Sequence, residues 1–137
     1  MGTVRNSDFK FEKYLIKESS IFIGDNFQDN GEFNISIFPK GKKSGKKFYL
    51  TLEISVCNND STFKVSVVMD GTFSFRENIQ KKDITNFFYL NAPAIMFPYL
   101  RGYISTITAL SGVGTIILPT MNLTSLAKEI EDNTVEE

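Results

Sequence analysis

The chain has 137 residues, of which 42% are hydrophobic and 23% are charged, and its formal net charge is −1. This composition is typical of one globular domain, and the near-neutral charge argues against a nucleic-acid partner, which normally requires a basic excess. We therefore expect a single domain over residues 1–137, ordered over about residues 9–131 and ending in an acidic tail at residues 132–137.

The chain contains no His and a single Cys. Without His, the most common general base and metal ligand are missing, and neither a Ser–His–Asp nor a Cys–His catalytic set can form. The sequence also lacks the apolar core of a signal peptide and any run of about 18 apolar residues that could span a membrane. We expect a cytoplasmic protein that is not an enzyme, needs no cofactor or metal and inserts into no membrane.

The first half of the chain alternates between apolar and polar residues, which is the period of half-buried strands. The alternation slips near Lys13–Tyr14, as at a β-bulge, and Gly71 marks a further bulge. We predict four strands joined by hairpin-sized connections into an antiparallel meander: Phe9–Ile23, Glu32–Phe38, Phe48–Cys57 and Thr62–Phe75.

From about Lys81 the apolar spacing becomes helical. One stripe runs through five residues: Met96, Leu100, Tyr103, Ile107 and Leu110. Pro98 allows two interpretations, because it either opens a helix or lies within one helix that runs from about Lys81 to Ser111. Gly112 is expected to end the helix in a left-handed conformation.

After the helix, we predict an extended crossover at Thr115–Leu123. Thr124 is predicted to be the N-cap of a short helix at Ser125–Glu131. Strands followed by helices predict an α+β fold. We expect a four-stranded antiparallel sheet with a long helix and a short C-terminal helix packed on one face. The lysine-rich segment Lys40–Lys47 then lies between two strands, as a solvated hairpin tip or a charged docking patch, since its spacing does not match a phosphate-binding loop.

The stretch NAPAIMFPYLRGYIST resembles the first helix of SecB-type export chaperones, and Ile95, Phe97, Pro98, Tyr99 and Arg101 match that family's pattern in order. LPTMNLTSLAKEI is similar to the family's crossover and second helix, and VVMDGTFSF to its last strand. In the first strand, six residues fall where the family has similar ones: Phe9, Phe11, Lys13, Lys17, Glu18 and Ser20.

The resemblance implies a homotetramer, built as a dimer of dimers, that holds unfolded polypeptide clients in apolar grooves without ATP. The 13 Phe residues fit this expectation, because a small domain cannot easily bury so many rings alone. In export members an acidic outer face of the sheet docks the SecA motor, and Glu18 is the candidate for that contact here.

Two further sets of residues follow from the resemblance, and each could instead be core between the sheet and the helices. The candidates for a client-peptide groove are Phe33, Ile35, Ile37, Phe38, Met121, Leu123 and Leu126. The candidates for an oligomer interface are Phe63, Val65, Val67, Met69, Met96, Leu100, Tyr103 and Ile107.

The chain also departs from the export pattern, since Phe22, Lys64 and Ser66 stand at outer-face positions where the family differs. Three hypotheses therefore remain open. The first is an export holdase that docks SecA. The second is a SecB-like chaperone with another client, such as an antitoxin, and without SecA. The third, from another class, is a carrier of small apolar ligands.

Overall fold

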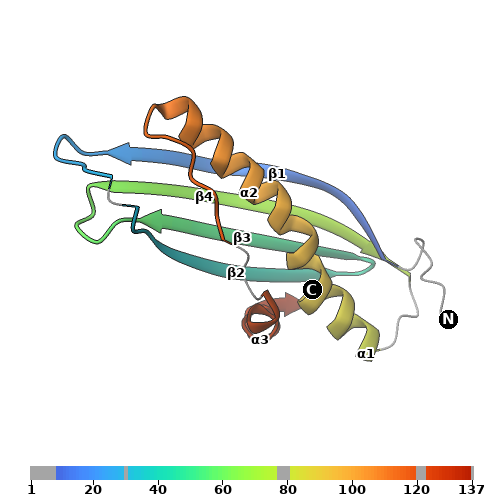
Figure 1. Cartoon of the computed structure of the whole chain (residues 1–137). Helices are drawn as coiled ribbons and strands as arrows, with labels where there is room; N and C mark the ends of the chain where they lie inside the picture. Colours follow the sequence, from blue (N-terminus) through green and yellow to red (C-terminus); the bar gives the residue numbers. More distant parts are fainter. Residues whose placement is uncertain (1–8, 30, 77–80, 120–122, 137) are drawn as a thin grey trace.

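Four long strands form the body of the molecule (Figure 1). The computed structural model describes residues 9–29, 31–76, 81–119 and 123–136. All four predicted strands are present: β1 Phe9–Ile23, β2 Asn34–Ser44, β3 Lys47–Cys57 and β4 Phe63–Phe75.

The order of the strands differs from the predicted meander. β2, β3 and β4 are hairpin neighbours, but β1 pairs with β4, which gives the order β1-β4-β3-β2-β5 and a Greek-key connection. Alternation determines which face a residue occupies, but not which strand lies beside it. Directly after β1, the Gly24 N–H donates to the Thr62 carbonyl at 2.7 Å, which holds the end of β1 beside the start of β4.

The acidic tail, which we expected to be frayed, forms a short fifth strand. β5, Thr134–Glu136, pairs in parallel with β2 at residues 41–43. The Asn133 side-chain amide donates to the Pro39 carbonyl at 3.2 Å, and the Gly41 N–H donates to the Asn133 carbonyl at 3.3 Å. Gly41 is needed here because a Cβ atom would overlap the Thr134 hydroxyl. The sheet is therefore mixed and five-stranded, not four-stranded and antiparallel as predicted.

The basic segment Lys40–Lys47, predicted to be a loop or patch at a hairpin tip, is mostly strand. β2 continues to Ser44 and β3 begins at Lys47, so that only Gly45 and Lys46 form the turn. Gly45 has φ +58°, a left-handed conformation that favours glycine. Because strand residues alternate, the lysines of this segment are divided between the two faces of the sheet.

β1 is irregular, and its pairing with β4 shifts at two places, between Phe11 and Lys13 and between Ile16 and Glu18. The first shift confirms the predicted slip near Lys13–Tyr14. Gly71, in contrast, marks no bulge between β3 and β4, which pair in unbroken register through it. A Cβ atom at Gly71 would lie 2.5 Å from the Met96 sulfur, so the glycine makes room for the helix above the sheet.

The helical run passes both prolines without a break. α1, Lys81–Ile84, continues through a π-helical segment, η1 Thr85–Asn91, into α2, Ala92–Ser111. Pro98 lies inside α2, which supports the second interpretation of this proline. The π-helical segment ends just before Pro93, where the Ala92 N–H donates to the Phe87 carbonyl five residues back. Gly112, at φ +92°, ends α2 as predicted.

α2 runs diagonally across one face of the sheet, which we call the inner face (Figure 1). Its buried residues recur every three to four positions: Ala92, Pro93, Met96, Phe97, Leu100, Ile104 and Thr108. The predicted stripe shares Met96 and Leu100 with this set. It then leaves the core, because Tyr103 and Ile107 are half-buried and Leu110 is 82% exposed.

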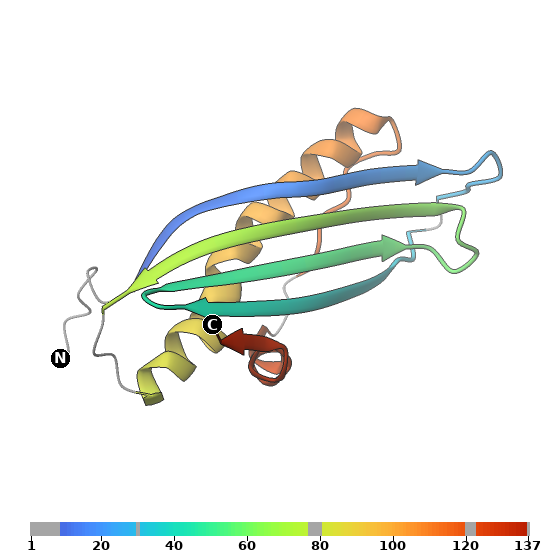
Figure 2. The same cartoon turned by 180° about the vertical axis from the view of Figure 1, so that it is seen from behind.

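The inner face of β3 and β4 supplies most of the remaining core: Phe48, Leu50, Leu52, Ile54, Val56, Phe63, Val65, Val67, Met69 and Phe73. Phe88 of η1 closes this core at one end, where its ring stacks on Phe48 with the centroids 4.3 Å apart. Seen from behind, the opposite, outer face carries no helix from the described part of the chain (Figure 2).

A 3₁₀ turn, η2 Leu123–Ser125, leads into α3, Leu126–Asp132, which lies beside β2. Thr124 is therefore not the N-cap that we predicted, because the 3₁₀ turn moves the cap position to Ser125. Over the described ranges, the structure contains no helix with the length and apolar character that a membrane span requires.

Candidate functional site

The predicted groove residues do not share one face of the sheet. In the pairing of β2 with β3, Ile35 and Ile37 lie opposite residues of the inner-face core, and both pack against it. Phe38 lies opposite Glu53 on the outer face and is 58% exposed. Since neighbouring strand residues point to opposite faces, the sheet separates Phe38 from the other candidates, which corrects the predicted set.

The candidates around the crossover have mixed positions. Leu123 is half-buried and packs against the core, and Leu126 is only 9% exposed, so it is mainly part of the scaffold. Met121 lies outside the described residues. Phe33, directly before β2, is half-buried on the inner side and is the predicted residue that the structure brings to a cavity.

That cavity, of about 290 Å³, lies beneath the start of the crossover, and we call it the crossover groove. Its apolar lining comes from three parts of the chain: Phe27, Phe33, Phe63, Val113, Ile116 and Ile117. The Phe27 and Phe63 rings stack with centroids 5.1 Å apart, and Phe33 meets Phe63 edge-on at 5.5 Å. The Phe27 and Phe33 rings therefore form one wall of the groove, with the fully buried Phe63 ring packed against both, and the crossover forms the other wall.

Two polar side chains of α2 hold the crossover at this position. The Ser105 hydroxyl donates to the Ile116 carbonyl at 3.0 Å, and the Ile116 N–H donates to the Thr108 hydroxyl oxygen at 2.9 Å. Thr108 is fully buried, and its own hydroxyl donates to the Ile104 carbonyl at 2.7 Å. Both backbone groups of Ile116 are thus satisfied by α2. Sequence reasoning missed Ser105 and Thr108, because hydroxyl residues near a helix end are common and give no specific signal.

The groove has an exposed apolar residue at its rim, since Ile117 is 70% exposed. Isolated exposed apolar residues need no explanation, but Ile117 lines a cavity with an aromatic wall. The arrangement suits an extended polypeptide that places apolar side chains into the groove and along its rim.

Most of the predicted oligomer-interface residues are core. Six of them are fully buried within the single chain: Phe63, Val65, Val67, Met69, Met96 and Leu100. α2 covers this part of the inner face, so these side chains have no surface to offer a second copy, and the core alternative is correct for them. Tyr103 and Ile107, on the flank of α2, remain half-buried.

A different apolar surface lies along β1 and the flank of α2. β1 is the edge strand of the sheet, with β4 on one side and no strand of the described chain on the other. Tyr14 of β1 packs on Tyr99 of α2 with ring centroids 4.8 Å apart, and these two rings are 41% and 45% exposed. The Tyr103 hydroxyl hydrogen-bonds the Ser19 hydroxyl at 2.7 Å. A long open edge with exposed rings beside it is a surface on which chains associate.

Glu18 lies on the outer face, where the family resemblance requires a docking residue. It lines a shallow hollow of about 300 Å³ together with Ser20, Glu53 and Ser66. This end of the outer face therefore carries two carboxylates. The family's acidic character is kept here in part, with Glu53 as a second acidic residue that sequence reasoning did not single out.

The pKa shifts in the molecule do not indicate acid–base chemistry. A hydrogen bond from Lys47, and a further one from Ser74, lower the pKa of the Glu12 carboxyl. Burial raises the pKa of the Tyr89 hydroxyl. Hydrogen bonds from the Thr62 hydroxyl and the Thr62 N–H lower the pKa of the Asp60 carboxyl. All three shifts keep the group in its ordinary charge state at neutral pH, whereas the pKa values of catalytic acids and bases are tuned toward neutral pH.

Comparisons with known proteins agree with this architecture. The family model of preprotein translocase subunit SecB matches residues 8–133. An uncharacterized protein of Methanocaldococcus jannaschii is 26% identical over 132 residues, which cover 90% of this chain and 84% of that protein.

Two solved structures share the fold. The SecB-like chaperone Rv1957 of Mycobacterium tuberculosis, in complex with a ChAD peptide from the Rv1956 HigA1 antitoxin, matches with a TM-score of 0.70 at 9% identity, over 84% of this chain and 88% of that one. A protein of unknown function from Streptococcus agalactiae matches with a TM-score of 0.50 at 9% identity, over 82% of this chain and 98% of that one. With the family model extending over residues 8–133, the chain belongs to the SecB family.

Proposed function

We propose that the protein is a holdase chaperone that binds unfolded or non-native polypeptides in the crossover groove, in the cytoplasm and without ATP. The observation that carries this proposal is the groove itself, where Phe27, Phe33 and Phe63 face the crossover and Ile117 is exposed at the rim. The SecB-like neighbour in complex with an antitoxin peptide supports a polypeptide as the ligand.

The groove is suited to weak and unselective binding. Burial of one large apolar side chain contributes about 2 kcal/mol before ordering costs, so a single contact holds a client only briefly. Several grooves in one oligomer would act on the same client chain, and their contributions would combine through effective concentration. Such a surface binds many sequences without a sequence code, which is what a holdase requires.

The test is suppression of aggregation of a chemically denatured model substrate, followed by light scattering without nucleotide. We expect the wild-type protein to suppress aggregation and Ile117→Asp, at the groove rim, to lose most of this effect. Phe38→Asp is the matched control, because Phe38 is also a highly exposed apolar residue but lies on the outer face. Protection that is absent in the wild type, or equally lost in both variants, would refute the proposal.

We further propose that the protein assembles as a homotetramer, a dimer of dimers, through the β1 edge and the flank of α2. The open edge of β1 and the exposed Tyr14 and Tyr99 rings support this assembly. The mass in solution tests it, and Tyr99→Glu should reduce the mass. Tyr49→Glu, at an exposed tyrosine on the outer face, should not. A monomeric wild type carrying a stoichiometric small apolar ligand would contradict the proposal and favour the carrier hypothesis.

The client class separates two versions of the chaperone. An export chaperone needs a docking contact with SecA on the outer face near Glu18, whereas a chaperone with a dedicated client, such as an antitoxin, does not. The antitoxin peptide on the SecB-like neighbour favours the second version. A binding assay with purified SecA decides between them, because tight and salt-sensitive docking that is lost in Glu18→Lys would refute the dedicated-client version.

A further inference from the structure

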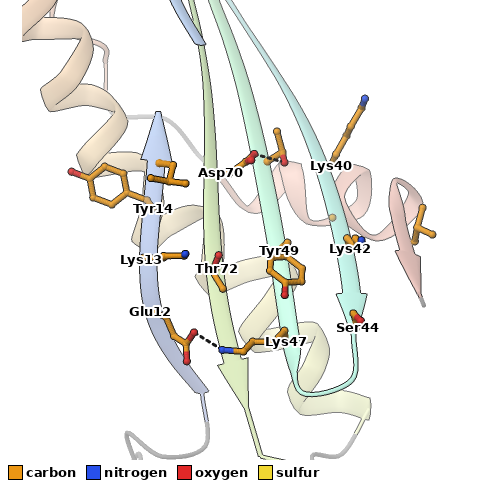
Figure 3. A pocket seen from close by; sticks show the side chains of 14 residues that line it. Glu12, Lys13, Tyr14, Lys40, Lys42, Ser44, Lys47, Tyr49, Asp70 and Thr72 are labelled. Atoms are coloured by element: carbon orange, nitrogen blue, oxygen red, sulfur yellow. Dashed lines mark hydrogen bonds and ion pairs between the residues drawn. The ribbon is translucent and has the colours of Figure 1, made fainter. Parts of the chain in front are cut away.

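One hollow of the outer face lies at the end of the sheet where β2 turns into β3, and its volume is about 830 Å³ (Figure 3). All five strands contribute residues to it. Its charged lining consists of four lysines and two carboxylates: Lys13, Lys40, Lys42, Lys47, Glu12 and Asp70. The formal charges leave a surplus of two positive charges. We call this site the basic hollow.

Both carboxylates of the basic hollow are engaged within the chain. The Glu12 carboxylate pairs with the Lys47 ammonium at 2.5 Å, and the Asp70 carboxylate accepts a hydrogen bond from the Thr51 hydroxyl at 2.6 Å. Within the described ranges, Lys13 and Lys40 have neither an ion pair nor a hydrogen bond through the side chain. Figure 3 shows Lys13 pointing from β1 toward the middle of the sheet, with Tyr14 turned away from it. These two ammonium groups are therefore available to an incoming anion.

The positive charge is local. The whole chain has a net charge of −1, and the other end of the outer face carries Glu18 and Glu53 around its smaller hollow. The same sheet face is thus basic at one end and only weakly acidic at the other, where Lys64 of β4 offsets one of the two carboxylates. A docking partner would therefore be oriented by the field along the face as well as attracted by it.

The basic hollow also has apolar parts. Leu15 is 52% exposed, Val135 is 62% exposed and the Tyr49 ring is 38% exposed, and all three line it. A surplus of two charges is small for nucleic acid, since duplex-binding proteins commonly neutralise about 6–10 phosphates. The lysine ends are open to solvent, and no buried donor is present among the lining residues, so a small free anion would be held weakly. Carboxylates with apolar side chains between them match this lining best.

We propose that the basic hollow docks an extended polypeptide segment of a partner protein, in which pairs of acidic residues alternate with pairs of apolar residues, so that each face of the segment presents both kinds. The acidic side chains contact Lys13 and Lys40, and the apolar ones contact Leu15, Tyr49 and Val135. The sheet separates this site from the crossover groove, so the partner can bind while a client is held. Docking at the basic hollow is independent of the proposed holdase activity.

The probe is a synthetic peptide of about 12 residues with the repeat Glu-Glu-Leu-Leu, labelled with an uncharged fluorophore, because in an extended chain this repeat places both Glu and Leu on each face. Its binding to the full chain is measured by fluorescence anisotropy. The matched peptides replace every Glu with Lys, or every Leu with Ser. A single-stranded oligonucleotide of similar length represents the alternative polyanion.

We expect the Glu-Leu peptide to bind the wild-type protein most tightly. Its affinity should be about tenfold or more lower for the double variant Lys13→Glu/Lys40→Glu. It should also fall about tenfold or more when the salt concentration is raised from about 0.02 M to about 0.3 M. Lys64→Glu is the matched control, because Lys64 lies on the outer face of β4 at the acidic end, and it should change the affinity less than about twofold. The milder Lys13→Gln/Lys40→Gln should give an intermediate loss, so that a folding defect of the charge-reversed variant does not decide the result.

Several outcomes would overturn the proposal. They are equal binding of the Lys-containing peptide, tighter binding of the oligonucleotide, an equal loss in Lys64→Glu, or a binding affinity that none of the lysine variants changes. Aggregation suppression by the same variants separates this proposal from the holdase. If the peptide does not bind while the suppression of aggregation is intact, only the proposal for the basic hollow is refuted. If Ile117→Asp abolishes peptide binding as well as suppression, the two sites are not independent.

Discussion

The two faces of the sheet are made by the same strands but have opposite characters. On the inner face, the side chains of β3 and β4 from Phe48 to Val56 and from Phe63 to Phe73 are almost completely buried under α2. On the outer face, most of the alternate residues are charged, hydroxyl-bearing or exposed. The covered face therefore determines stability, and the surfaces for which we propose functions lie elsewhere, at the crossover, at the β1 edge and on the outer face.

The largest effect that distinguishes the faces is expected from removing a ring. Phe88→Ala should lower the free energy of unfolding by about 3–5 kcal/mol, because Phe88 is buried and stacks on Phe48 at 4.3 Å. Phe38→Ala, on the outer face, should change it by less than about 0.5 kcal/mol. Urea unfolding at one fixed protein concentration measures both, since assembly makes stability concentration-dependent. Similar losses in the two variants would contradict the distinction between the faces.

A smaller effect is expected where the sheet meets its last strand. Gly41→Val should destabilise the protein by about 1–3 kcal/mol, because the added side chain would collide with Thr134 and displace β5. Gly102→Ala is the control, since an added Cβ atom there meets nothing within 4 Å and alanine favours the helix. Hydrogen exchange should show faster exchange of the Gly41-flanking β2 amides in the first variant only. Unchanged exchange would mean that β5 contributes little.

The crossover provides a third comparison, between two threonines of α2. Thr108→Val leaves the Ile116 N–H without its acceptor and should cost about 1 kcal/mol, as well as weakening client holding through a looser groove. Thr106→Val is matched to it, because the Thr106 hydroxyl bonds only within the helix, to the Gly102 carbonyl at 2.8 Å. If Thr108→Val still suppresses aggregation while Thr106→Val does not, the hydrogen bond between Thr108 and Ile116 does not position the groove.

The smallest effect concerns Glu12 on the outer face. Its pKa is lowered by Lys47 and Ser74, so its contribution to stability is present above the unfolded pKa and is lost as the pH falls through the lower folded pKa. Wild type should be slightly more stable than Glu12→Gln at neutral pH, and the difference should shrink as the pH falls below the ordinary pKa of a Glu carboxyl. Urea midpoints across this range test the expectation, and a difference that grows toward acidic pH would contradict it.

Much of the fold could be predicted from local pattern. The alternation located the four long strands, and the glycine after Ser111 located the end of α2. The position of β1 beside β4 could not be predicted, because strand pairing depends on the path of a connection and not on alternation. β5 could not either, because its three residues are too few to show a period and it depends on the space left by Gly41.

Less of the candidate site could be predicted. The family resemblance led to Phe33. Phe38 was grouped with Phe33 because the two are close in sequence, but neighbouring strand residues point to opposite faces, and Phe38 lies on the outer face. Phe27 and Ile117 lie in irregular segments without a repeat, and Ser105 and Thr108 act through one distant residue. Such contacts arise only from the tertiary arrangement.

The short β5 also determines how this sheet can grow. It pairs with β2 at Gly41–Lys43, beside α3 and close to Pro39, which has no amide hydrogen, and so shortens that open edge. The longer open edge for a second copy is then β1. If β1 pairs with β1 about a twofold axis, both open edges are consumed and strand addition stops at two chains. The three residues of β5 would thus favour closed assemblies over the open-ended strand addition that forms fibres, although the surface is rich in apolar side chains.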